Sequence, residues 1–100
     1  MRLVDFSESS LITDLQDLDL AAKYLEDVLS QGSIESFLHA IRNVAIANGG
    51  IQKLSENTKL GRESMYKALS RSGNPLFSTV HKILAEMGFR LSVATAVLDR

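Results

Sequence analysis

The sequence predicts an all-α protein with five helices and one short C-terminal strand. From residue 18 onward, apolar residues recur every three or four positions, which is the spacing of a buried helix face. Glycine or a Gly-Asn-Pro run interrupts that spacing, and both commonly mark the ends of helices. The length of 100 residues suffices for one compact core. We therefore expect an N-terminal arm at residues 1–16 and a single helical domain at residues 17–100.

The arm shows no stable apolar period, so we expect it to be extended or loosely docked. The first helix should start at Asp17 or Asp19, either of which can cap it, and stop at Gly32. Its apolar stripe consists of Leu18, Ala21, Ala22, Leu25, Val28 and Leu29.

The second helix has the clearest pattern, with Ser33 as its N-cap and the glycine pair Gly49 and Gly50 at its end. Its single apolar face consists of Ile34, Phe37, Leu38, Ile41, Val44 and Ala45. Three short pieces follow this helix. We expect a two-turn helix over 51–57, a tight turn over 58–61 and another helix over 62–70.

The breaker at 72–75 precedes a last helix over 76–87, which Gly88 ends. Residues 89–93 then alternate between apolar and polar, which predicts one half-buried strand. A lone strand cannot satisfy its backbone groups. We expect it to pair with the same strand of a second copy, through Phe89, Leu91 and Val93, and so form a homodimer. Residues 1–6 are the competing strand partner.

Charge is divided unevenly along the chain. Residues 1–50 hold three basic and eight acidic side chains, net −5, whereas residues 51–100 hold eight basic and four acidic ones, net +4. This division suggests two surfaces with different partners. The chain has no Cys, two His and no paired-carboxylate spacing, so we expect no cofactor, no metal and no enzymatic activity. No membrane-length apolar run or signal peptide is found, which predicts a cytoplasmic protein.

The pieces around the tight turn have the spacing of a helix-turn-helix, at about residues 51–70. Such a motif needs a small residue in its first helix, a tight turn and an apolar residue in its second helix. Ser55, Lys59 and Met65 fall at these positions. The second helix would enter the major groove of DNA, where Arg62 can offer paired donors to guanine. The predicted DNA-binding residues are Gln52, Gly61, Arg62, Glu63, Tyr66, Lys67 and Arg71.

The run LGRESMYKALSRSGNPLFSTVHKIL resembles the addiction-module antidote proteins, HigA-like members of the lambda-repressor-like (Cro/C1-type) helix-turn-helix class. The matching positions are Leu60, Arg62, Glu63, Tyr66 to Leu69, Gly73-Asn74-Pro75, Phe77, Thr79-Val80 and Gly88. The chain departs from the pattern with Ser55 for Ala, Lys59 for Gly, Gly61 for Ser and Leu76 for a polar cap. A side chain at positive φ costs on the order of 1 kcal/mol, so Lys59 puts the turn geometry in question.

The resemblance implies an antitoxin that neutralises a small basic toxin, commonly a RelE-like ribonuclease, and represses its own operon as a dimer on operator DNA. The protein would then be prokaryotic and associated with the nucleoid at its operator. The acidic half would face the toxin, with apolar anchors in the arm at Leu3, Phe6, Leu11, Ile12 and Leu15. Alternatively, these side chains complete the chain's own core. Two other functions stay open: a stand-alone repressor without a toxin, and a helical interaction domain that has lost DNA binding.

Overall fold

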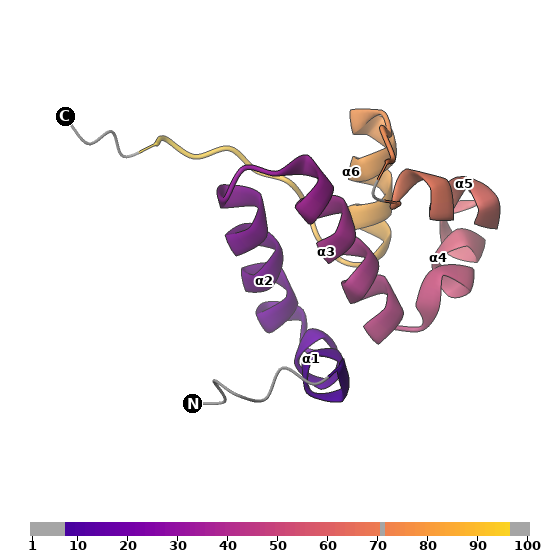
Figure 1. Ribbon diagram of the computed structural model, residues 1–100, viewed down its shortest axis with the longest axis horizontal. Coiled ribbons are helices and arrows are strands. Elements are labelled where there is room, and N and C mark those ends of the chain that lie inside the picture. Colours follow the sequence, from indigo (N-terminus) through magenta and orange to yellow (C-terminus); the bar gives the residue numbers. More distant parts are fainter. Residues whose placement is uncertain (1–7, 71, 97–100) are drawn as a thin grey trace.

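The computed structural model describes residues 8–70 and 72–96 and is all-helical over that part of the chain (Figure 1). The all-α class is therefore confirmed, with one helix more than expected. The six helices are α1 (Glu8–Leu15), α2 (Leu18–Ser30), α3 (Ile34–Ala47), α4 (Gly50–Thr58), α5 (Arg62–Ala68) and α6 (Phe77–Glu86).

Helix α3 lies at the centre and packs against α1, α2 and α4 (Figure 1). It begins where the Ser33 hydroxyl accepts a hydrogen bond from the Ser36 N–H at 3.2 Å, as expected of an N-cap. It contributes more side chains to the core than any other helix of the described residues, because seven of its side chains are buried. These are Phe37, Leu38, Ala40, Ile41, Val44, Ala45 and Ala47. Tyr24 of α2 is tied to this helix, since its hydroxyl accepts from the Asn43 amide at 3.0 Å.

The segment that was expected to be extended or loosely docked contains helix α1. Leu15 is only 2% exposed, and Leu11 and Ile12 pack against the same core. The Asn48 side-chain amide also donates to the Leu15 carbonyl at 2.9 Å and to the Val44 carbonyl at 2.8 Å, which joins the end of α1 to α3. Eight residues are too few for a clear apolar period, and tertiary packing stabilises so short a helix.

The prediction of a C-terminal strand is wrong, and with it the five-helix-plus-strand architecture. Residues 89–96 form neither helix nor strand, and the described part of the chain contains no strand with which they could pair. The alternation has another cause: Phe89 and Leu91 pack against the core, whereas Val93 is fully exposed. The Phe89 N–H donates to the Leu84 carbonyl at 2.9 Å, which fixes the start of this segment on the end of α6.

Over residues 8–70 and 72–96, no helix is both long and apolar enough to cross a bilayer.

Candidate nucleic-acid interface

Helices α4 and α5 are joined by a turn of three residues. Its first residue, Lys59, caps α4 in the left-handed region at φ 64° and ψ 16°, and its N–H donates to the Ser55 carbonyl at 3.0 Å. Lys59 is the one non-glycine residue with positive φ among the described residues. The turn therefore keeps the conformation that favours glycine, although a lysine occupies it.

Buried side chains between the two helices fix their arrangement. Met65 of α5 is fully buried and Ser55 of α4 is 8% exposed. These burials agree with the motif, which needs an apolar residue in its second helix and a small residue in its first helix. Thr58, which the sequence analysis missed, is also fully buried. Its hydroxyl donates to the Ser55 carbonyl at 3.4 Å and accepts from the Leu60 N–H at 3.3 Å. Thr58 thus gives the Leu60 N–H of the turn a partner and adds a second donor to the Ser55 carbonyl, which also accepts from Lys59.

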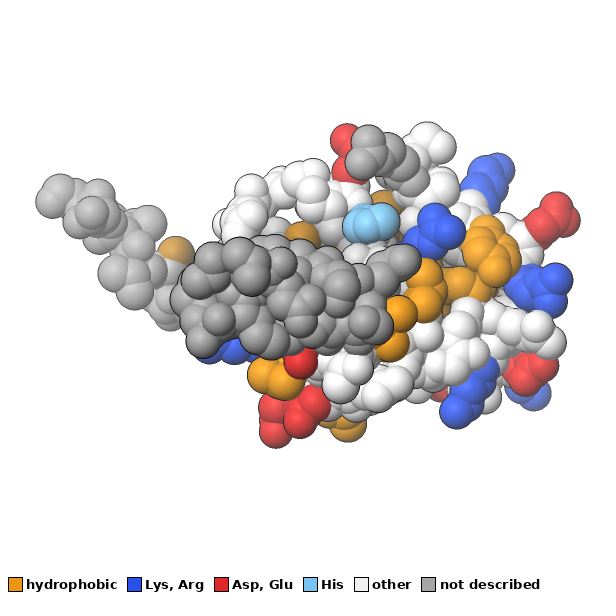
Figure 2. Space-filling model, turned by 60° about the horizontal axis from the view of Figure 1, so that its bottom comes forward, with side chains coloured by type: hydrophobic (Ala, Val, Ile, Leu, Met, Phe, Trp, Pro, Cys, Tyr) orange, Lys and Arg blue, Asp and Glu red, His pale blue; other side chains and the backbone are white. Residues whose placement is uncertain are grey.

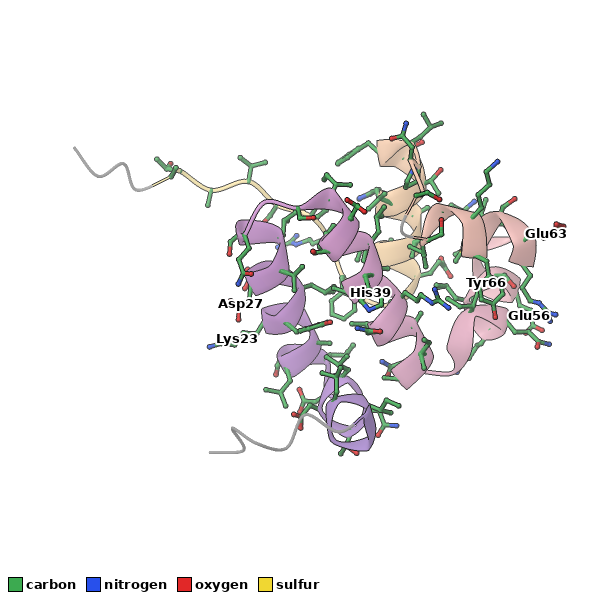
Figure 3. All side chains as sticks on the ribbon, viewed as in Figure 1. Lys23, Asp27, His39, Glu56, Glu63 and Tyr66 are labelled. Carbon is green, nitrogen blue, oxygen red and sulfur yellow. The ribbon has the colours of Figure 1, made fainter. Side chains whose placement is uncertain are left out.

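The outer face of α5 carries the predicted DNA-binding residues. Helix α5 begins after the N-cap Gly61, whose φ of −61° and ψ of 149° are ordinary extended values. Arg62, Glu63 and Lys67 are exposed, and Tyr66 is 47% exposed. Glu63 and Tyr66 lie at the α4–α5 end of the molecule (Figure 3). The helix therefore presents two cations, one carboxylate and one aromatic hydroxyl to solvent.

Gln52 was expected to reach a phosphate, but its side chain has a partner within the protein. The Arg62 guanidinium donates from Nη1 to Gln52 Oε1 at 3.2 Å, between two exposed side chains. This contact joins α4 to the first residue of α5. It uses one of the five N–H donors of the guanidinium and leaves others available for a ligand.

A shallow hollow beside α5 brings together polar residues that the sequence analysis did not select. Ser64 and Asn74 line it together with Lys67, and Ser64 and Asn74 are both exposed. Ser64 could have been found from the sequence, because it stands three residues before Lys67 on the same short helix. Asn74 could not, because its position depends on the loop between α5 and α6. The remaining predicted residue, Arg71, lies outside the described residues.

Charge separates along the fold as it does along the sequence. Residues 50–69, which contain α4 and α5, hold four basic and two acidic side chains, net +2. Residues 8–35, which contain α1 and α2, hold one basic and seven acidic side chains, net −6. Much of the visible Lys and Arg lies at the α4–α5 end (Figure 2). An anionic ligand would therefore be attracted to this end and repelled from α2.

Three of the apolar residues predicted to anchor a toxin pack in or against the core. Leu15 is buried, and Leu11 and Ile12 pack against the core. Leu3 and Phe6 lie outside the described residues. The three leucine and isoleucine side chains of α1 thus contribute to the chain's own core, which was the alternative stated for them.

Comparison with known proteins identifies the family. The profile of a family described as "probable addiction module antidote protein" matches residues 5–95. The chain belongs to this family. The resemblance carried by the motifs around α5 is thereby confirmed at the level of the antidote family. The antidote protein is also 32% identical over 92 residues to an uncharacterized protein of Haemophilus influenzae, and the match covers 92% of this chain and 91% of the relative. No solved structure matches significantly.

Membership in this family gives the antidote protein a role in a toxin-antitoxin system, with a toxin of some kind as its partner. Such a role is regulatory and suggests binding instead of catalysis. Within the described ranges, no group of three His, Asp or Glu side chains is arranged to hold a metal ion.

The turn between α4 and α5 allows a direct test. Lys59→Gly is expected to raise the free energy of unfolding by about 1 kcal/mol, because it relieves the positive φ at that position. Lys53→Gly, in the interior of α4, removes the same charge and should instead lower it by about 1 kcal/mol. Urea unfolding of both variants checks the prediction. A Lys59→Gly variant no more stable than the natural chain would show that the turn stores no strain.

Proposed function

We propose that the antidote protein neutralises a small basic toxin, a RelE-like ribonuclease, by binding it directly, and represses its own operon as a homodimer. The DNA-binding element in this proposal is the helix-turn-helix made of α4 and α5. The main support for this proposal is the outward face of α5, where Arg62, Tyr66 and Lys67 are exposed. The buried side chains of Met65 and Thr58 hold α5 and α4 together behind this face.

The side chains on α5 suit the edges and backbone of a DNA duplex. The guanidinium of Arg62 can donate twice to guanine, and the Glu63 carboxylate can accept from the amino group of cytosine. Lys67 supplies a point charge for a phosphate or a donor for guanine. The positive balance of residues 50–69 favours the approach of a polyanion at this end.

Dimerisation follows from the size of the recognition element. A helix of seven residues contacts only a few base pairs, so a specific operator is bound by two copies on half-sites about one helical turn apart. The homodimer is therefore proposed from the demands of operator recognition and does not depend on residues 89–93.

The toxin surface is proposed on the acidic side of the molecule. A basic ribonuclease is attracted to the segment of net charge −6, whereas DNA is repelled by it. The two partners would then use different ends of the same chain, with α3 between them (Figure 1).

The test has two arms, one for each partner. The small protein encoded by the adjacent reading frame is co-expressed with the antidote protein, and we expect it to co-purify and its toxicity to be relieved. Separately, the promoter fragment of the operon is titrated with the antidote protein at two salt concentrations, and we expect binding that weakens as salt rises. An adjacent protein that neither binds nor inhibits growth would contradict the antitoxin role. Equal affinity for the promoter and for random DNA would contradict autorepression.

A further inference from the structure

We infer that the toxin inserts an apolar side chain into a groove between α2, the start of α3 and residues 89–92. This inference rests on the proposed function, because it takes a basic protein toxin as the partner. It assigns the surface of the antidote protein that contacts the toxin. Instead of side chains of α1 inserting into the toxin, a side chain of the toxin inserts into this groove.

The groove is mostly apolar and large enough for one side chain. Its volume is about 190 Å³, and Ala22 and Leu29 of α2, Phe37 of α3 and Leu91 of the C-terminal segment form its apolar walls. A protein cavity of roughly 150 Å³ lined by aliphatic and aromatic side chains holds a benzene ring. The groove therefore has room for one side chain of the size of leucine or phenylalanine.

One wall of the groove, formed by Leu29, is accessible to solvent. Leu29 is 41% exposed, although it continues the apolar stripe of α2 whose members Ala21 and Leu25 are buried. Burying an exposed leucine against another apolar side chain is favourable. Because Leu15 already fills the core and Leu11 and Ile12 pack against it, α1 offers no comparable accessible anchor.

The charges around the groove select its occupant. Glu26 lines it, Asp27 follows on α2, and Glu35 stands in the first turn of α3. Arg90 lines the groove as well, which leaves three acidic side chains against one basic one among these four residues. Surfaces of opposite charge associate faster and reject like-charged partners. A basic protein thus fits the groove better than a second copy, which would bring the same acidic side chains of two chains together.

Figure 3 places Lys23 and Asp27 on the side of α2 that faces away from α3, at the opposite side of the molecule from Glu56, Glu63 and Tyr66. The groove borders this helix and contains no residue of α4 or α5. A toxin seated there would leave the outward face of α5 uncovered.

The test compares two exposed leucines of the same helix. Leu29 lines the groove, whereas Leu20 is 48% exposed and stands nine residues earlier, which is half a turn away on a helical wheel. Leu29→Arg should weaken binding of the protein encoded by the adjacent reading frame by about tenfold or more, as expected for a central apolar contact. Leu20→Arg introduces the same charge and should change the affinity far less. Calorimetric titration of the full-length variants measures both.

A second variant tests the groove at an exposed residue, where a substitution should not disturb folding. Glu26→Lys alters an exposed residue of the groove wall and should slow association of the basic partner several-fold, with the circular dichroism melt unchanged. Equal affinity for Leu29→Arg and Leu20→Arg, with association of Glu26→Lys unchanged, would overturn the groove assignment while leaving the proposed function intact. If the adjacent protein fails to bind the natural chain, the proposed function itself fails. If Leu29→Arg instead converts a homodimer to a monomer in light scattering without the toxin, the groove holds a second copy and the assignment is wrong.

Discussion

Replacing Ile41 with alanine is expected to lower the free energy of unfolding by about 3 kcal/mol, within the range of 2–5 kcal/mol for large-to-small changes in cores. Ile41 has no exposed surface and stands in the middle of α3, the helix that α1, α2 and α4 all contact. The lost side chain leaves a cavity inside the core that the packed surroundings cannot easily fill. The melting temperature should fall by roughly 12–24 °C for a domain of this size.

Ile46 provides the matched control, because it belongs to the same helix and is 46% exposed. Ile46→Ala removes the same atoms from a site that water already reaches, and should cost less than about 1 kcal/mol. Urea unfolding with a common slope for both variants makes the two values comparable. Similar losses for both substitutions would mean that α3 is not the centre of the core.

Arg62→Ala is expected to cost about 1–3 kcal/mol of binding free energy on the operator and much less on random DNA, if the guanidinium reads a base. The contact with Gln52 holds the side chain at the junction of α4 and α5 before any ligand arrives. Lys67→Ala should weaken binding to both DNAs and reduce the slope of log affinity against log salt by about one, as the loss of one phosphate contact requires.

Lys23→Ala is the control for these substitutions. It removes one cation from the outside of α2, away from α5 (Figure 3), and should leave DNA binding almost unchanged. Fluorescence anisotropy on operator and random duplexes at several salt concentrations measures all three variants. Equal losses on both duplexes for Arg62→Ala would make it a positioning contact, and no loss for Arg62→Ala or Lys67→Ala would mean that another element faces DNA.

Much of the fold follows from signals that are local in the sequence. Ser33 and Gly49 bound α3 as expected, since caps and glycines act on the backbone next to them. Helix α1 was missed because its formation depends on burial of Leu15 and on the Asn48 amide, which lies 33 residues away. The strand was predicted in error at residues 89–93, since packing of Phe89 and Leu91 on a core produces the same alternation as a half-buried strand.

Some features of the candidate site could likewise be predicted from the sequence, whereas others could not. The exposure of Arg62, Glu63 and Lys67 could be predicted, because helical periodicity and the buried Met65 fix which face of α5 is outward. The Gln52–Arg62 bond and the two roles of the Thr58 hydroxyl could not. The first depends on how the turn at Lys59 sets α5 against α4, and the second depends on the path of the turn itself. The sequence leaves that geometry open where lysine replaces glycine.

The opposite charges at the two ends of the fold make the molecule an electric dipole, although its net charge is only −1. Near a duplex, the phosphates exert a torque that turns the α4–α5 end forward before any contact forms. The Debye length is about 8 Å at physiological ionic strength, so this alignment acts only in the last stage of approach and disappears as salt is added. Added salt should therefore make encounters less well oriented, and part of its effect on the proposed DNA binding should appear as slower association.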